Sequence, residues 1–283
     1  MSLPSLRDIH ADPTPRAFTV AHRGAWHDNA ENSLASIEAA IAMGCAMVEI
    51  DVQQSADGTL FAFHDGWMRR MTGREVMPSA LAWQDLHGTR LRQRDGGATA
   101  PLSDQHMPTL NEVLELTRGR IHVDLDAKER NIVPAVAQAA KAMGCADEVN
   151  VKGWMMSATD IAEGLAWSRE LPCVVKPLIF VGTSNFDAVR DLIEQFDPPV
   201  VEAFFEELPL AFHLAEHLRA QGRDLFVNTL DAACSTGVND SQALVDPEGR
   251  WGKLADAGIR FLQTDEPEAM QTWLNGTLDQ GQD

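Results

Sequence analysis

Side chains of the kind that bind metal ions and transfer protons are concentrated between residues 20 and 65. Glu49 and Asp51 stand two residues apart in the apolar run 46–53, and His22 and His64 end the apolar runs on either side of it. Residues two apart in a strand project from the same face, so the two carboxylates are expected to lie together. At about 4 Å, two such charges repel by roughly 4 kcal/mol at an effective dielectric constant near 20. A cation, a shared proton or a basic side chain must therefore compensate the pair.

Simpler interpretations exist for both residue types. Two acids at this spacing are also typical of the solvated face of an edge strand, and a lone histidine is more often a core or surface residue than a catalyst. Apolar segments flank the acidic run, which favours a central strand. Histidines bracket it on both sides, which favours one shared site.

The order and spacing of short motifs across nearly the whole chain resemble the glycerophosphodiester phosphodiesterase family. These motifs are His22-Arg23-Gly24, Glu31-Asn32-Ser33, Glu49-Ile50-Asp51-Val52, Asp57-Gly58, His64-Asp65, Arg70-Met71-Thr72-Gly73, Pro108-Thr109-Leu110-Asn111-Glu112-Val113-Leu114, Asp126-Ala127-Lys128 and Gln263-Thr264-Asp265-Glu266-Pro267. The resemblance implies a metal-dependent enzyme that hydrolyses a small-molecule glycerophosphodiester to an alcohol and sn-glycerol 3-phosphate.

Strand and helix patterns alternate along the chain. The expected strands are 18–22, 46–53, 59–64, 121–126, 149–151, 173–175, 200–204, 225–229 and 259–263. The expected helices are 31–43, 109–117, 132–143, 157–165, 186–196, 209–221, 251–257 and 266–274. About eight strand–helix units in this order predict an α/β fold with a closed parallel (β/α)8, or TIM, barrel. A doubly wound open sheet is the alternative, but no glycine-rich nucleotide fingerprint follows the first strand.

Residues 66–107 interrupt this alternation with several arginines and no sustained period. We interpret them as a small insertion after the second barrel strand, because long irregular loops in compact domains are usually functional or disordered. We expect most of their arginines to be solvated. The resemblance implies that this segment is the inserted subdomain at the active-site mouth. With no internal repeat evident, residues 1–283 are expected to form one phosphodiesterase barrel domain.

The strand ends of a closed parallel barrel face one cavity, which would bring distant side chains together. Three carboxylates with no cysteine suit a hard divalent cation, either Mg²⁺ or Ca²⁺. The resemblance implies that Glu49, Asp51 and Asp126 are the metal ligands. Asp126 stands where the family usually has Glu, so the ion is expected closer to that strand or bridged by water.

The resemblance also implies roles for the neighbouring polar residues. His22 and His64 would be the general acid and base, and Arg23 and Lys128 would bind the phosphate. The nucleophile is either water or a neighbouring substrate hydroxyl that forms a cyclic phosphate. Glu31 either supports the site, because the family has a carboxylate there, or is an ordinary charge at a helix N-terminus.

Other residues are assigned by position alone. We expect Asp124 to form a buried ion pair with Lys128, and Lys152 and Glu202 to face the cavity. The family often has Trp at the position of Asn228, so the substrate preference is expected to differ from the usual glycerol diester. Trp26 and Trp67 either line the cleft or pack against the fold.

Composition narrows the partners and the compartment. The formal net charge of −19 argues against nucleic acid and anionic membranes as partners. A phosphate site must then be made attractive locally by a metal and basic side chains. Residues 1–16 resemble neither a signal peptide nor a membrane anchor, although a natural leader before the opening Met-Ser-Leu is an open alternative. The four dispersed cysteines are expected to be reduced, buried thiols of a cytoplasmic protein.

Two alternative functions remain beside the leading one. A phospholipase-like lipid phosphodiesterase would use the same core, but no hydrophobic anchor is apparent, which favours the deacylated substrate. A non-catalytic anion-binding barrel is expected to lack at least one of His22, Glu49, Asp51 and His64, and all four are present. The sequence predicts no particular oligomeric state.

Overall fold

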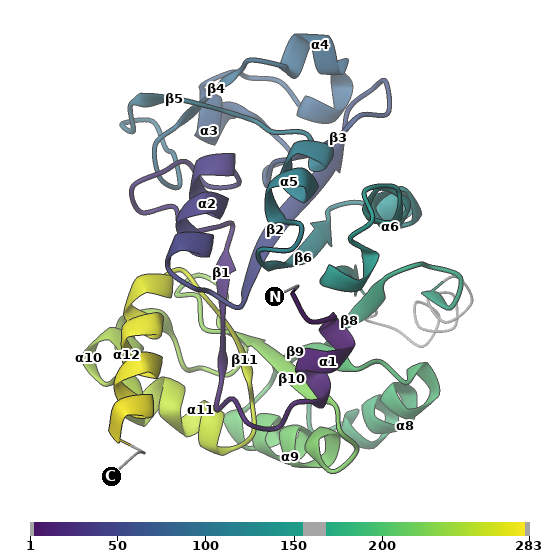
Figure 1. Cartoon of the computed structure of the whole chain (residues 1–283), viewed down its shortest axis with the longest axis vertical. Helices are drawn as coiled ribbons and strands as arrows, with labels where there is room; N and C mark the ends of the chain where they lie inside the picture. Colours follow the sequence, from purple (N-terminus) through teal and green to yellow (C-terminus); the bar gives the residue numbers. More distant parts are fainter. Residues whose placement is uncertain (1–2, 155–167, 281–283) are drawn as a thin grey trace.

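The computed structural model describes residues 3–154 and 168–280, and its centre is a closed barrel of eight parallel strands (Figure 1). In order around the barrel, the strands are β1 (Phe18–His22), β2 (Met47–Gln54), β6 (His122–Ala127), β7 (Val149–Trp154), β8 (Val174–Val181), β9 (Val200–Phe205), β10 (Asp224–Asn228) and β11 (Phe261–Thr264). Strand β1 pairs with both β2 and β11, which closes the ring. The predicted TIM barrel is therefore confirmed, and the alternative of an open sheet is wrong.

Helices follow most barrel strands and cover the outside of the barrel. They are α2 (Leu34–Ala42), α5 (Leu110–Thr117), α6 (Val133–Ala142), α8 (Phe186–Phe196), α9 (Leu208–Arg219), α10 (Asp240–Val245), α11 (Lys253–Asp256) and α12 (Pro267–Gln280). Short turns accompany them at η2 (Arg130–Ile132), η3 (Ala146–Glu148) and the π-helical η4 (Glu248–Gly252). The predicted helix at 157–165 lies outside the described residues.

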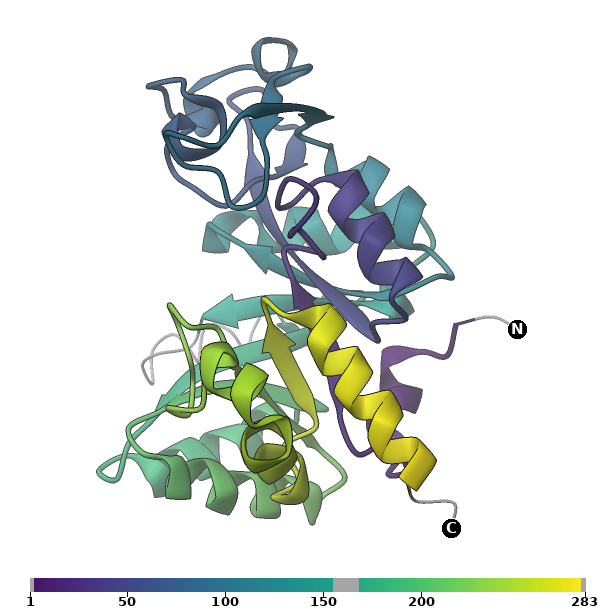
Figure 2. The same cartoon turned by 90° about the vertical axis from the view of Figure 1, so that its left-hand side faces the viewer.

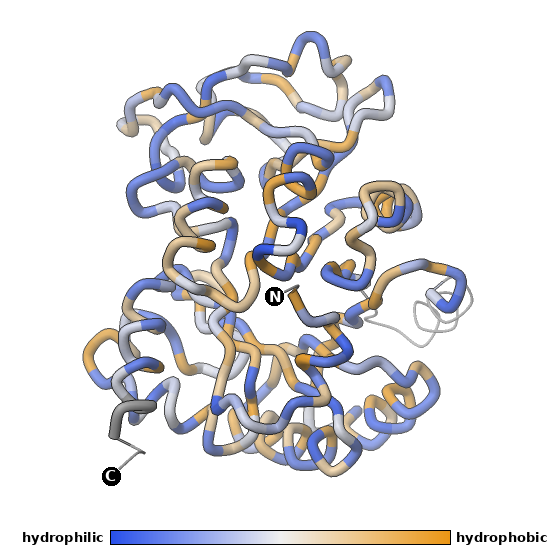
Figure 3. The backbone as a smooth tube through the Cα atoms, viewed as in Figure 1, coloured by the Kyte–Doolittle hydropathy of each residue, from blue (hydrophilic) through white to orange (hydrophobic). Residues whose placement is uncertain are grey.

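Alternation along the strands separates two environments. Val48, Ile50 and Val52 of β2 point outward into the apolar layer beneath the helices, where each is fully buried. Glu49 and Asp51, between them, point into the barrel. Hydrophobic residues follow the strands and hydrophilic residues the connecting loops, as Figure 3 shows. The period-two pattern of this strand therefore aims both carboxylates at the barrel interior.

Several predicted boundaries are wrong for local reasons. The helix expected from residue 31 begins at Leu34, because the Ser33 side chain caps it by accepting a hydrogen bond from the Ser36 amide. Strand β8 extends well beyond the expected 173–175. The helix expected at 251–257 is divided between η4 and α11, and the short α10 was not predicted.

An N-terminal helix that the sequence did not predict, α1 (Leu6–Ala11), closes one end of the barrel. Its Leu6 and Ile9 pack against barrel residues that include Phe226 and Phe261. The His10 Nδ1 atom lies 2.7 Å from an Asp224 carboxylate oxygen, so the polar edge of the helix is also satisfied. This apolar plug lies at the N-terminal ends of the strands and leaves the opposite ends for the polar site.

Residues between β2 and α5 form a separate layer at one end of the molecule, which Figures 1 and 2 both show. Its elements are β3 (Leu60–Ala62), α3 (Arg69–Thr72), η1 (Pro78–Ala80), α4 (Trp83–Leu86), β4 (Arg90–Arg92) and β5 (Leu102–His106). Strand β3 pairs antiparallel with β2, and β4 with β5. Buried side chains such as Phe61, Met68 and Leu91 give this layer its own apolar cluster. Strand β3 corresponds to the predicted strand 59–64, whereas the other elements are too short to produce a recognisable period in the sequence.

A buried ion-pair network occupies the middle of the barrel. The Lys176 ammonium lies 2.6 Å from a carboxylate oxygen of Asp124 and 2.6 Å from one of Glu202, and the Phe226 ring lies 3.3 Å away. The predicted pairing of Asp124 with Lys128 is therefore wrong. Asp124 stands one inward-facing position below Asp126, where a lysine from β8 reaches it.

Replacing this buried cation should destabilise the fold strongly. Lys176→Met leaves two buried carboxylates without their main partner, and we expect the free energy of unfolding to fall by about 3–5 kcal/mol. Denaturant titration measures this change. Arg120→Met is the control, because its ion pair with Glu38 lies on the surface and its loss should hardly change the midpoint. Similar small effects for both variants would contradict the proposed importance of the buried pair.

Candidate active site

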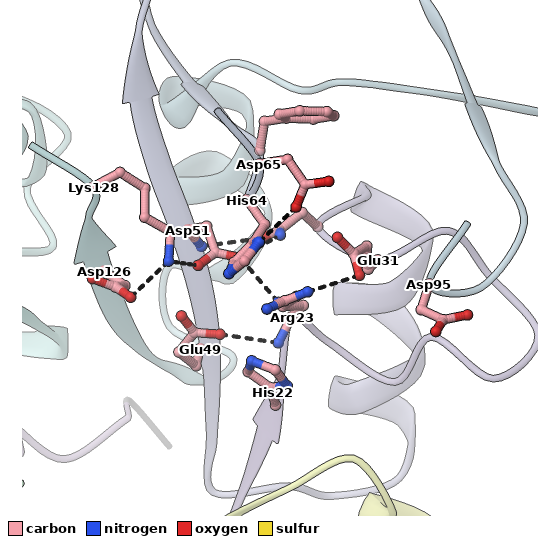
Figure 4. Close-up of polar contacts among 12 residues, drawn as sticks. His22, Arg23, Glu31, Glu49, Asp51, His64, Asp65, Asp95, Asp126 and Lys128 are labelled. Carbon is pink, nitrogen blue, oxygen red and sulfur yellow. Dashed lines mark hydrogen bonds and ion pairs between the residues drawn. The ribbon is translucent and has the colours of Figure 1, made fainter. Parts of the chain in front are cut away.

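Three carboxylates meet at the C-terminal ends of β2 and β6. Glu49, Asp51 and Asp126 are all buried, and they offer oxygen atoms that lie within 4.8 Å of one another. Asp51 and Asp126 are register partners on the two adjacent parallel strands, so the barrel itself brings them together. Figure 4 shows the three side chains pointing toward a common centre.

Basic side chains compensate part of this charge. The Lys128 ammonium lies 2.5 Å from an Asp51 oxygen and 2.9 Å from an Asp126 oxygen. Burial opposes ionisation of both aspartates, but nearby cations hold their pKa values below the ordinary range: Lys128 and Arg23 act on Asp51, and Lys152 and Lys128 on Asp126. Burial, together with the charge of Asp51, raises the pKa of Glu49 well above its ordinary value. The cluster thus still needs a positive charge or a proton at Glu49.

The donor set fits a hard divalent cation. All three ligating groups are carboxylates, and Mg²⁺ and Ca²⁺ both prefer oxygen ligands. In addition, Asp126 Oδ1 is buried and has no hydrogen-bond partner among the described residues, although its carboxylate lies among lysines. A cation would satisfy this oxygen and the unmet charge of Glu49 together.

Two histidines at this end of the barrel are each held by a carboxylate. The His22 Nδ1 atom lies 2.7 Å from Asp265 Oδ1, and the His64 Nδ1 atom lies 2.7 Å from Asp65 Oδ1. In both pairs, the Nε2 atom remains available for proton transfer. Burial alone would raise the pKa values of Asp265 and Asp65. The hydrogen bonds from His22 to Asp265 and from His64 to Asp65 instead help to hold both pKa values below the ordinary value.

Both aspartates stand within the sequence motifs, but no role was predicted for either of them. Asp65 directly follows His64, and Asp265 directly follows β11, so each is near a strand end. Their positions were visible in the sequence, but the pairing of Asp265 with His22 depends on closure of the barrel between β11 and β1.

Glu31 connects the barrel to the inserted layer. This carboxylate is buried and lies 3.0 Å from Arg23 Nη1 and 2.5 Å from Arg70 Nη2. Arg70 also contacts Asp65, with 2.7 Å between Nε and Oδ2. The expectation that arginines of this segment are solvated is therefore wrong for Arg70. Glu31 precedes the helix rather than starting it, and two arginines surround it, which favours its supporting role over that of a helix-end charge.

Asn32 stands in the motif Glu31-Asn32-Ser33 and contacts Asp51, a contact that the sequence did not predict. Its Nδ2 atom donates to Asp51 Oδ2 at 2.7 Å, and its Oδ1 atom accepts from the Asp51 amide at 3.0 Å. Asn32 adopts a left-handed backbone conformation with φ of 56°, which asparagine tolerates better than most residues. The side chain thereby fixes the orientation of one predicted metal ligand.

The site residues share a cavity of about 460 Å³. The predicted positions of Lys152 and Glu202 on this cavity are confirmed, since both line it. Asn228 and Trp26 line it as well, so for Trp26 the alternative of lining the cleft holds. An adjoining hollow of about 710 Å³ in the inserted layer shares His64 and Arg70 with it and contains Trp67, which is 54% exposed. The cavity therefore opens toward the inserted layer.

A further buried acid, Asp240, holds the backbone of Asp265, the partner of His22. Asp240 Oδ2 accepts a hydrogen bond of 2.8 Å from the Asp265 amide, and Asp240 Oδ1 accepts one of 2.6 Å from Thr229 Oγ1. Burial raises the pKa of Asp240 to about 7. Asp240 opens α10, so the sequence offered no strand or helix signal that would have placed it here.

A TIM barrel with carboxylates, basic side chains and imidazole–carboxylate pairs at one end defines a hydrolase that acts on phosphate esters. The model of the glycerophosphoryl diester phosphodiesterase family matches residues 22–269. The chain therefore belongs to this family and is a glycerophosphodiester phosphodiesterase by class, which confirms the resemblance seen in its motifs and argues against a non-catalytic barrel.

Curated relatives carry two kinds of name. Lysophospholipase D GDPD1 of Rattus norvegicus is 22% identical and matches 90% of this chain and 85% of its own length. Glycerophosphodiester phosphodiesterase 1 of Bos taurus is 41% identical, but the match spans 44% of this chain and 38% of the relative.

Solved structures share the fold at low sequence identity. A glycerophosphoryl diester phosphodiesterase from Parabacteroides distasonis has a TM-score of 0.77 and 19% identity, with 98% of this chain and 94% of that chain covered. A phosphodiesterase from Oleispira antarctica, in complex with the product sn-glycerol-3-phosphate, has a TM-score of 0.63 and 19% identity, with 91% and 96% covered.

Two observations bear on the environment of the protein. None of the helices in the described part of the chain is long and apolar enough to cross a membrane. All four cysteines are free, but Cys173 and Cys234 are only half-buried, so the expectation of buried thiols holds for Cys45 and Cys145. The cytoplasmic location stays a prediction.

The raised pKa of Asp240 predicts a pH-dependent loss of stability. Its ordinary pKa is 3.8, so between about pH 4 and pH 7 the native state holds a proton that the unfolded chain has lost. The free energy of unfolding should therefore fall as the pH rises through this window. Asp240→Asn should remove this part of the slope in denaturant titrations at pH 5 and pH 8, whereas Asp187→Asn on the exposed face of α8 should not. Parallel profiles for the wild type and Asp240→Asn would contradict the prediction.

Proposed function

We propose that this protein hydrolyses glycerophosphodiesters to an alcohol and sn-glycerol 3-phosphate, with a divalent cation and two histidines. The observation that carries the proposal is the meeting of a three-carboxylate cluster and two imidazole–carboxylate pairs in one cavity. The cation and the acid–base groups would then act on one phosphate. The product named with the Oleispira antarctica relative supports the same reaction.

Glu49, Asp51 and Asp126 would hold the cation, either Mg²⁺ or Ca²⁺. When bound, such an ion neutralises charge on a phosphoryl oxygen and orients the attacking group. Arg23 and Lys128 would bind the remaining phosphate charge, and both are held beside the cluster by Asp51. The chain thereby offers local positive charge to an anionic substrate despite its net charge of −19.

His22 and His64 would transfer the protons of the reaction. One imidazole accepts the proton of the nucleophile, either water or a neighbouring substrate hydroxyl, and the other donates a proton to the leaving alkoxide. Asp265 and Asp65 would orient the two rings by accepting the Nδ1–H hydrogen bonds, so that each Nε2 faces the substrate. The side chain of His64 is 36% exposed and that of His22 is 13% exposed, so protons can exchange with solvent more readily at His64.

Residues 66–107 would act as an inserted subdomain at the mouth of this cavity, within one domain that spans the chain. Arg70 supports this role, because it joins the segment to Glu31 and Asp65. Glu31 would support the site by holding Arg23 in place. The subdomain would therefore contribute to the order of the site as well as covering it.

The resemblance to a lysophospholipase D over most of the chain keeps a lipid diester as the second candidate substrate. The many polar side chains of the cavity favour the deacylated diester. Apolar residues such as Leu178, Phe204 and Leu230 also line the cavity and would contact an acyl-bearing substrate.

The decisive experiment measures release of glycerol 3-phosphate from a panel of head-group diesters. We expect activity that a chelator abolishes and that Mg²⁺ or Ca²⁺ restores. Asp126→Asn should also weaken binding of the ion alone in a calorimetric titration, whereas Asp104→Asn on the exposed face of β5 should leave it unchanged. Activity that a chelator leaves unchanged would refute the proposed metal dependence. Absence of glycerol 3-phosphate release from every diester of the panel would refute the proposed substrate class.

The two histidines can be tested separately from the metal. His22→Ala and His64→Ala should each lower kcat by about 10²–10⁴-fold, the usual contribution of one general acid or base. Both variants should still bind the cation, since neither histidine belongs to the carboxylate cluster. His213→Ala on the exposed face of α9 is the matched control. Near wild-type turnover in either site variant would show that the assignment is wrong.

A further inference from the structure

Within the described part of the chain, two buried amide side chains on β10 and β11 lack a hydrogen-bond partner for their carbonyl oxygens. Asn228 and Gln263 are register partners on these adjacent strands, and both line the cavity. They are 5% and 2% exposed, yet neither Asn228 Oδ1 nor Gln263 Oε1 has a hydrogen-bond partner among residues 3–154 and 168–280. Buried polar groups are almost always paired, so these two oxygens point to a ligand that supplies hydrogen-bond donors.

The orientation of the Asn228 amide follows from its neighbours. Its Nδ2 atom donates to Glu202 Oε1 at 3.2 Å, and the Glu202 carboxylate is held by Lys176 at 2.6 Å. A carboxylate only accepts hydrogen bonds, so the amide must turn its NH₂ group toward Glu202. Asn228 Oδ1 is therefore the free end of the amide, and the ion-pair network of the barrel fixes it there.

We propose that Asn228 and Gln263 form a diol-binding subsite, in which each carbonyl oxygen accepts a hydrogen bond from one of two neighbouring substrate hydroxyl groups. The subsite rests on the proposed function, because it recognises the free glycerol hydroxyls of a deacylated glycerophosphodiester. Adjacent strands lie about 4.8 Å apart, which suits two groups on neighbouring carbon atoms. The hydroxyls would replace ordered water without loss of hydrogen bonds.

The neighbouring charges favour neutral hydroxyls over an ammonium group. The Lys152 ammonium lies 3.4 Å from Glu202 Oε2, on the carboxylate that also holds Asn228. A second positive charge beside this lysine would be repelled, whereas a hydroxyl donates a hydrogen bond without adding charge. An acyl chain offers no donor and would leave both carbonyl oxygens unpaired.

The subsite and the carboxylate cluster line the same cavity. Lys152 lies between them, 3.5 Å from Asp126 and 3.4 Å from Glu202, and Glu202 lies 3.2 Å from Asn228. A glycerol attached to a phosphate at the cluster would extend along this wall of the cavity toward the subsite. A lysophospholipid, whose diol carries an acyl chain, can fill only half of the subsite.

A pair of substrates that differ by one hydroxyl tests this assignment. The substrates are sn-glycerol-3-phosphocholine and 2-hydroxypropyl phosphocholine, which keeps the hydroxyl beside the ester carbon and lacks the terminal one. Release of choline gives kcat/KM for both in the same protein preparation, so the ratio of the two values is independent of the folded fraction. The wild type should favour the glycerol diester by about tenfold, the effect of one lost hydrogen bond to a buried group.

The variants are Asn228→Leu, Gln263→Met and their combination. The ratio of the two kcat/KM values should fall toward one in the double variant. It should also fall toward one in the single variant that lacks the amide bound to the terminal hydroxyl group. Gln54→Met, at the end of β2 and outside the cavity, makes a matched change and should keep the preference.

Three outcomes would overturn the proposals. A wild type that releases choline from neither substrate refutes the proposed function, and the subsite with it. An active wild type whose preference survives in all the variants refutes the subsite alone. Equal losses on both substrates also refute it, because they show that the amides only support the fold.

Discussion

Burial of like-charged carboxylates inside the barrel is the constraint on which the rest of the structure depends. Glu49, Asp51, Asp124, Asp126 and Glu202 all point into one interior and are almost fully buried. Charges in such a place are tolerated only when cations face them. The barrel supplies lysines from β7, β8 and the loop after β6. The negative charge that these lysines leave uncompensated is concentrated where β2 meets β6.

The interior of the barrel is arranged in layers that follow from this constraint. Apolar residues and α1 fill the N-terminal end, ion pairs around Lys176 fill the middle, and the open carboxylate cluster lies at the C-terminal end. Each layer packs directly against the next along the barrel axis. Lys176 compensates both Asp124 and Glu202 in the middle layer, whereas the cluster of Glu49, Asp51 and Asp126 lies in the cavity, where an ion can enter.

Much of the fold and part of the site could be predicted because their signals are local. The alternation that points Glu49 and Asp51 inward is contained in one strand, and the order of strands and helices predicts the barrel. Pairings across the ring are not local. The link from His22 to Asp265 and the one from Asp124 to Lys176 each join distant strands, so they depend on closure and register.

Short elements escaped prediction for a different reason. The segments α1, α3 and α10 have too few residues to show a period, yet they carry His10, Arg70 and Asp240, each in contact with a buried or active-site acid. These residues are recognisable only by what they contact. Gln263 likewise became informative only when its oxygen was found without a partner.

The α1 plug has a consequence for the order of events during synthesis. This helix precedes every barrel strand in the sequence, but its partners include Phe226, Phe261 and Asp224, which follow most of the other strands. Contacts between such distant segments form late and slow the folding of a chain. The N-terminal end of the barrel therefore cannot be completed before β10 and β11 have been synthesised, and until then the apolar face of α1 lacks these partners.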